Sequence, residues 1–149
     1  MPNPILIYGE IWEQTNPTIL ARVTDENGVV FTNASVAAPS GGLLGWDLRI
    51  YDLTSNAPDT VIYSLLAQAV VTGTDGNQIF SSSLLTTGWS LDAVGYNFRY
   101  TVPSTVATFE GGHTYRYEWR VSYIADAAAH VAGKAYIVAE IKHKPVLTE

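Results

Sequence analysis

The chain has 149 residues, of which 47% are hydrophobic, and this length predicts a single domain over residues 1–149 with its own core. With 8 basic and 14 acidic residues the formal net charge is −6, which argues against nucleic acid and anionic membranes as partners. The absence of cysteine excludes disulfide bonds, thiolate catalysis and zinc sites built on Cys.

In chain order, we expect no signal peptide at the start of the sequence, followed by a series of short strands. Residues 1–4 lack a basic start and an apolar segment, so we expect a chain that is not exported. Segments rich in β-branched and aromatic residues then predict strands. The turn residues at 25–28 predict a hairpin over 19–30. The expected strands span 5–12, 19–24, 29–31, 46–53, 61–66, 70–72, 96–102, 114–124 and 135–141.

Two of the expected strands alternate so regularly that their faces are predicted as well. Tyr115 and Trp119 lie on the apolar side of one strand, opposite arginine and glutamate, and Phe98 lies on the apolar side of the other. We expect these three residues to determine the fold. Tyr115 also follows a Gly-Gly turn. It is expected either to bond back to the backbone, as in the tyrosine corner of immunoglobulin-like domains, or to be an ordinary core tyrosine.

The remaining pattern predicts an all-β fold. No long window repeats with helical spacing, and the Ala-rich segment 125–132 is too short for an isolated helix, so a loop or a single turn is expected there. About seven to nine short strands joined by Gly- and Pro-rich turns are typical of an antiparallel, immunoglobulin-like β-sandwich. Its core is expected over roughly 18–142, with extended tails at 1–4 and 143–149.

Residue types that carry catalysis or bind metals form no recognisable pattern. His113, His130 and His143 lack the spacing of a zinc motif and are expected to be solvated or interface residues. The acidic turn 25–28 has its glycine at the wrong position for a calcium loop, and the chain has no Gly-x-Ser-x-Gly motif. We therefore expect no enzymatic activity, no cofactor and no metal.

The four tryptophans point to a second class of function. Trp46 and Trp119 fall in phase with core residues, whereas Trp12 and Trp89 are candidates for exposed platforms. Aromatic platforms on β-sandwiches stack on sugar rings. A module that binds a surface glycan during host attachment is therefore the alternative to a structural protein.

Four phrases of the sequence together resemble a known family. They are the first hairpin, Ile50-Tyr51-Asp52-Leu53, Gly95-Tyr96-Asn97-Phe98-Arg99 and Gly111-Gly112-His113-Thr114-Tyr115. In this order they are similar to small immunoglobulin-like structural proteins of tailed bacteriophages, and the resemblance covers roughly 18–142. It implies a virion protein that is assembled in the host cytoplasm.

A capsid decoration or cement protein is the function that we expect from this resemblance. Such a protein would clamp adjacent major capsid subunits on the outer surface of the head, as a dimer or trimer; a tail or connector component is the alternative within the virion. Apolar loops and chain ends are the expected contacts, because soluble monomers rarely leave such patches uncovered. The predicted interface residues are Met1, Pro2, Asn3, Pro4, Ser40, Gly41, Gly42, Leu43, Leu44, Ala127, Ala128, Ala129, His130, Pro145, Val146 and Leu147.

Overall fold

The computed structural model describes residues 5–12, 17–24, 28, 30, 43–55, 57, 59–68, 80–102, 109–126 and 131–145. In these residues the chain forms eight strands in two sheets and no helix, which confirms the all-β prediction. The described part therefore contains no helix that could span a membrane. The strands are β1 (Ile5–Trp12), β2 (Thr18–Ala21), β3 (Leu43–Asp52), β4 (Val61–Gln68), β5 (Phe80–Leu85), β6 (Tyr96–Thr101), β7 (Thr114–Asp126) and β8 (Val131–Lys144).

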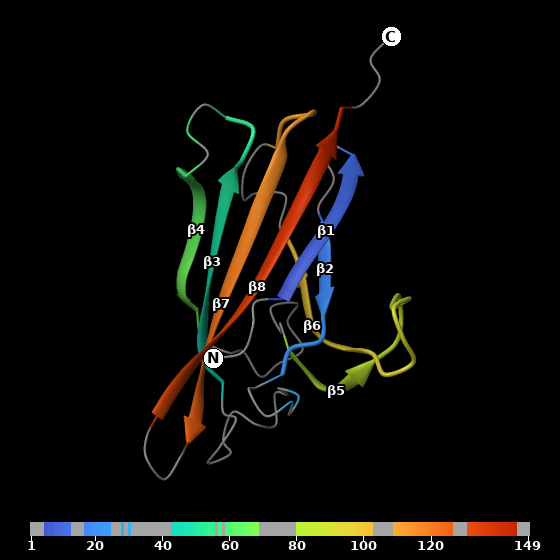
Figure 1. Cartoon of the computed structure of the whole chain (residues 1–149), viewed down its shortest axis with the longest axis vertical. Coiled ribbons are helices and arrows are strands. Elements are labelled where there is room, and N and C mark those ends of the chain that lie inside the picture. Colours follow the sequence, from blue (N-terminus) through green and yellow to red (C-terminus); the bar gives the residue numbers. More distant parts are fainter. Residues whose placement is uncertain are drawn as a thin grey trace.

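The two sheets form the layers of a sandwich (Figure 1). Five strands make the larger sheet in the order β1-β8-β7-β3-β4, and three make the smaller one in the order β2-β6-β5. The longest pairing is the β7–β8 hairpin, whose register runs from Thr114 opposite Lys142 to Asp126 opposite Val131. The larger sheet is therefore built around this hairpin, with β3 beside β7 and β1 beside β8.

The hydrophobic core lies between the sheets and takes side chains from the inner face of each. The predicted faces are confirmed, since Tyr115 is 1% exposed and Phe98 and Trp119 are 0% exposed. The Trp119 ring meets the rings of Phe98 and Tyr100 edge to face, with centroids 5.4 and 5.6 Å apart. These aromatic contacts join β7 directly to β6 across the sandwich.

One pairing departs from the antiparallel sandwich that the sequence predicts. β1 runs parallel to β8, with Ile5 opposite Ile137 and Trp12 opposite Lys144. Parallel neighbours need a long connection, and here the connection comprises most of the chain. The direction of such a pair is set by the path of the intervening strands, so the local pattern of β1 gives no sign of it.

The β7–β8 hairpin is longer than predicted at both of its ends. The predicted tail at 143–149 is wrong in its first two residues, because β8 continues to Lys144. The loop or turn predicted over 125–132 is likewise too long, since β7 continues to Asp126 and β8 begins at Val131. In both places the backbone groups are satisfied by continuing the ladder, which outweighs the local preference for a turn.

Of the predicted hairpin over 19–30, the structure describes residues 19–24, 28 and 30. β2 pairs with β6, and a single isolated bridge joins Thr24 to Val30. The main partner of β2 is therefore a strand distant in sequence. The turn residues 25–27, residues 29 and 31 of the predicted strand 29–31, and the predicted strand 70–72 lie outside the described residues.

Candidate functional site

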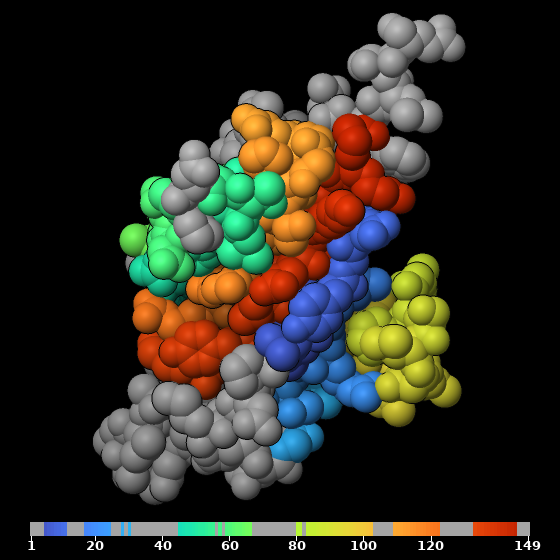
Figure 2. Space-filling model, turned by 45° about the horizontal axis from the view of Figure 1, so that its top comes forward, coloured from blue at the N-terminus to red at the C-terminus, as the bar shows by residue number. Residues whose placement is uncertain are grey.

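An open groove runs along the side of the sandwich where β1 and β2 are the edge strands of their sheets. Its volume is about 420 Å³, and the segment 86–95 between β5 and β6 contributes a further wall. Figure 2 shows β1 and this segment standing apart, with atoms of β2 between them. We call this open groove the β1 groove. Its lining residues are Ile5, Leu6, Ile7, Tyr8, Leu20, Ala21, Arg22, Trp89, Leu91 and Asp92.

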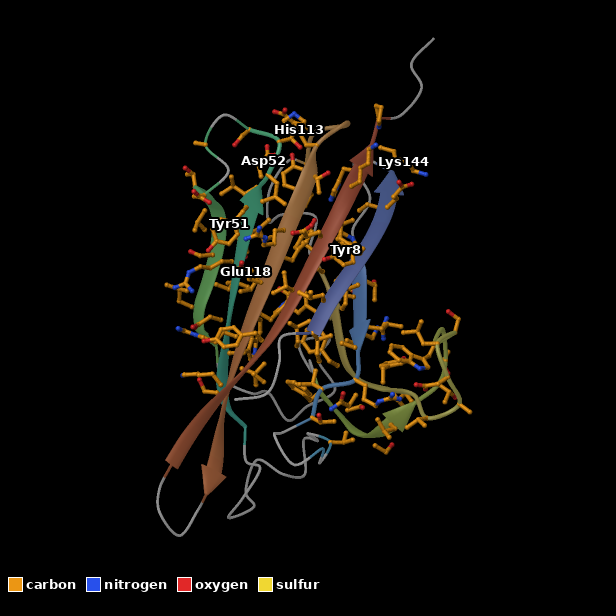
Figure 3. All side chains as sticks on the ribbon, viewed as in Figure 1. Tyr8, Tyr51, Asp52, His113, Glu118 and Lys144 are labelled. Atoms are coloured by element: carbon orange, nitrogen blue, oxygen red, sulfur yellow. The ribbon has the colours of Figure 1, made fainter. Side chains whose placement is uncertain are left out.

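The β1 groove is bordered by large apolar side chains that remain exposed. Alternation along β1 turns Ile5 and Ile7 toward the core and leaves Leu6 60% and Tyr8 72% exposed. Figure 3 shows Tyr8 on this edge strand. On the facing wall Leu91 is 78% exposed. Apolar side chains that gather on the surface of a soluble protein mark interaction sites.

The carboxylate of Asp92 holds the facing wall in place. Its Oδ1 accepts hydrogen bonds from Trp89 Nε1 at 2.9 Å and from the backbone N–H groups of Val94 at 2.9 Å and Gly95 at 3.1 Å. Its Oδ2 lies 2.8 Å from the guanidinium of Arg22, which follows β2. The Trp89 bond, the Gly95 N–H and the Arg22 contact hold the pKa of Asp92 well below its usual range. The wall is thus tied to the smaller sheet.

A second polar cluster lies at the end of the sandwich where β7 begins, and Figure 3 shows Asp52 and His113 together there. Nδ1 of His113 lies 2.7 Å from Asp52 Oδ2, and its Nε2 lies 3.2 Å from Glu110 Oε2. The side chain is partly exposed, as predicted for a solvated histidine, but both ring nitrogens contact carboxylates of the same chain. This cluster fixes the turn before β7 to the end of β3.

His143 contradicts the prediction of a solvated or interface residue, because it is 0% exposed. Its Nε2 lies 3.0 Å from the Tyr117 hydroxyl, and the rings of Phe109 and Tyr115 pack against it. Its Nδ1 has no hydrogen-bond partner among the described residues, and burial lowers its pKa to about 4. The signal that could have revealed it is the alternation of β8, which continues inward from Ile141 by two positions. His130 lies outside the described residues.

Most of the predicted interface residues also lie outside the described part of the chain. They are 1–4, 40–42, 127–130 and 146–147. Of the others, Leu43 and Leu44 begin β3, and Pro145 follows β8 and is exposed. The interface prediction therefore stays a prediction, and the β1 groove is a surface that the sequence did not predict.

The tryptophans fall into different environments. Trp46 and Trp119 are buried, which confirms their predicted place in the core. Trp89 is partly exposed in the β1 groove, where its ring is tilted against that of Tyr96 at a centroid distance of 5.8 Å. The side chain of Trp12 lies outside the described residues. Among the described side chains, Trp89 is the predicted aromatic platform that lines the groove.

The β1 groove, with its exposed apolar side chains, is the candidate binding site of the described part of the chain. Sequence reasoning missed Leu6, Tyr8 and Leu91, although two apolar residues on the outer side of an edge strand are a usable signal. Within the described residues, no three His, Asp or Glu side chains are grouped to hold a metal ion. A comparison of the sequence with models of protein families finds no match, and neither does a comparison with curated proteins.

Proposed function

We propose that this chain is a non-enzymatic structural protein of the tailed-bacteriophage virion, which decorates the outer surface of the head and clamps adjacent major capsid subunits. The observation that carries the proposal is the β1 groove, an apolar binding surface on the side of a densely packed sandwich. The resemblance of four sequence phrases to phage structural proteins supplies the virion setting.

The strand order supports an immunoglobulin-like fold. β3, β7 and β8 correspond to strands C, F and G of that fold, β4 to C′, and β2, β6 and β5 to B, E and D. Tyr115 supports the same assignment, because it stands near the start of β7 and its hydroxyl accepts a 2.8 Å hydrogen bond from the N–H of Glu110. A hydroxyl that bonds back across the preceding turn is the defining contact of a tyrosine corner.

The Gly-Tyr-Asn-Phe-Arg phrase supports a fold shared with the phage proteins, because its residues have structural roles. Gly95 has a φ of 106°, and a Cβ there would overlap the carbonyl oxygen of Leu85. The buried amide of Asn97 accepts a 2.7 Å hydrogen bond from the N–H of Val23 and donates one of 2.8 Å to its carbonyl. Phe98 belongs to the core. The phrase therefore holds the smaller sheet together.

Attachment to a capsid needs more contact area than one groove supplies. A stable protein–protein interface buries roughly 1,200–2,000 Å² in total, so several surfaces must contribute. The predicted contacts at Leu43, Leu44 and Pro145, and those in the segments outside the described residues, are part of the proposal. Contacts between copies of the chain, in a dimer or trimer, are the remaining part.

Copy number in purified virions tests this function. Quantitative mass spectrometry of particles should find the chain in amounts comparable with the major capsid protein, and electron microscopy should locate it on the outer face of the head. A copy number as low as that of one ring of subunits per particle would instead assign the chain to the connector or the tail. Absence from the particles would refute a virion role.

A glycan-binding module is the second candidate, favoured by the position of Trp89 in the β1 groove. The ring is partly exposed, but its N–H already donates to Asp92. Binding on a glycan array that is lost in Trp89→Ala and kept in Val94→Ala, a change on the same segment outside the lining, would favour this function over decoration.

A further inference from the structure

We propose that the β1 groove takes one extended, uncharged segment of the major capsid protein, which pairs with the free edge of β1 as an additional strand. This mode rests on the proposed function for the identity of the partner. Strand addition itself is supported by the backbone, side chains, volume and charges of the groove.

The backbone of β1 has an edge that no described strand occupies. β1 is the outermost strand of the larger sheet, and its eight residues pair with β8 on one side. Its one charged residue, Glu10, lies 3.7 Å from Lys144 of β8, and the register runs from Ile5 to Trp12 without a bulge, a proline or a lysine. Edge strands of monomeric proteins usually carry one of these features, which prevents pairing with another chain. β1 is therefore suited to accept a further strand.

The side chains on both walls match the alternation of an added strand. Successive residues of a strand point to opposite faces. One set would lie beside Leu6 and Tyr8 on the outer face of the larger sheet, and the other would enter the groove toward Leu20 and Leu91. Both sets would then meet apolar surface. The groove therefore selects a segment whose groove-facing residues are apolar, and apolar residues on the other face add further contact.

The volume of the groove limits the occupant to a short stretch of one chain. Strand residues advance about 3.3 Å, neighbouring strands lie about 4.8 Å apart and packed sheets about 10 Å apart, so one residue fills roughly 160 Å³. The groove of about 420 Å³ therefore holds about three residues of a strand. A contact this short is weak alone and becomes strong when the linked copies of a dimer or trimer bind one particle at once.

The charges in the groove favour an uncharged occupant. Arg22 and Asp92 are the charged residues of its lining, and they lie 2.8 Å apart. Oδ1 of Asp92 is already filled by three N–H donors, one of them from Trp89. A charged side chain that entered would lose water without gaining a partner. A sugar would find the same two polar side chains already bonded, so an apolar peptide fits the groove better than a glycan.

Binding of capped peptides to the full chain tests strand addition. The probe is an acetylated and amidated hexapeptide in which Val alternates with Thr, titrated while the backbone amides are followed by NMR and hydrogen exchange. We expect saturable binding with slower exchange at β1. The same peptide N-methylated throughout keeps its side chains but has no N–H donor, and it should bind at least about tenfold more weakly, the loss expected from one or two hydrogen bonds.

Two matched pairs of variants separate the groove from the rest of the surface. Leu91→Glu places a charge on the groove wall, whereas Val94→Glu changes an exposed residue of the same segment outside the lining. Tyr8→Lys alters β1, whereas Val61→Lys makes a comparable change on β4, the opposite edge of the sheet. The first member of each pair should weaken binding at least about tenfold, and the second should leave it within about twofold.

Three results would overturn strand addition. The first is the absence of peptide binding. The second is equally tight binding of the N-methylated and unmethylated peptides, or an equal loss of peptide binding in both members of a variant pair. The third is occupation of the groove by something else, either a glycan whose binding Leu91→Glu abolishes or a second copy of the chain in an oligomer that Leu91→Glu dissociates in sedimentation. These results are independent of the copy number in virions, which tests the proposed function separately.

Discussion

Acidification should destabilise the folded chain through His143, and the substitution His143→Gln should remove that effect. The imidazole is fully buried, and its Nδ1 has no hydrogen-bond partner among the described residues, so the folded state disfavours the charged form. Its pKa is lowered from 6.5 to about 4. At about 1.36 kcal/mol for each unit of pKa difference between the unfolded and folded states, this corresponds to roughly 3 kcal/mol of unfolding free energy.

The direction of the effect follows from which state takes up the proton first. The unfolded chain has the ordinary histidine pKa of 6.5, so it binds a proton before the folded chain does. The stabilisation is therefore complete above pH 6.5, decreases between pH 6.5 and about 4, and decreases no further below that through this group. Glutamine keeps an amide near the Tyr117 hydroxyl and does not titrate.

Urea unfolding of the two proteins, followed by tryptophan fluorescence, measures this difference. Free energies of unfolding are compared at a series of pH values between about 8 and 4. The original chain should lose roughly 3 kcal/mol more than His143→Gln over that range, and all other titrating groups cancel because both proteins contain them. Parallel pH dependences would refute the assignment of a buried, neutral imidazole.

Three further predictions concern the core, the turns and the chain end. Trp119→Ala should lower the unfolding free energy by about 3–5 kcal/mol in urea titrations, because it removes the ring that joins the two sheets. Gly95→Ala should cost at least about 3 kcal/mol or prevent folding, whereas Gly112→Ala, with φ of 86° but open space around it, should cost about 1–2 kcal/mol. Deleting 146–149 should reduce occupancy on undecorated heads in electron microscopy with an unchanged Tm; unchanged occupancy would remove this end from the contact.

Strict alternation made several elements predictable from the sequence. From Thr114 to Tyr123 of β7 every second residue is aromatic or aliphatic and the others are polar, so both the strand and the buried faces of Tyr115 and Trp119 could be predicted. β5 has no such pattern, because Phe80 is followed by three serines and the strand takes its place from pairing with β6. The burial of His143 was missed because a histidine that ends an apolar alternation resembles the start of a polar tail.

The candidate site was less predictable than the fold, for a different reason. The β1 groove brings residues near Tyr8 against residues near Leu91, which are far apart in the sequence. Their approach depends on the parallel pairing of β1 and on the Asp92 contacts with Arg22, and neither is encoded in a local pattern. Of the residues that line the groove, Trp89 alone was predicted as part of a binding surface, because an isolated aromatic residue outside the strand alternation is visible in the sequence.

The parallel pairing of β1 with β8 determines how the sandwich responds to a pulling force. The chain enters β1 at Ile5 and leaves β8 at Lys144, which lie at opposite ends of the paired register. Tension between the two ends therefore slides β1 along β8 and loads the hydrogen bonds of the whole register together. An antiparallel hairpin pulled at its open end would instead lose its bonds one after another. A domain fastened to its surroundings at both ends would thus resist stretching with the full strength of this pair.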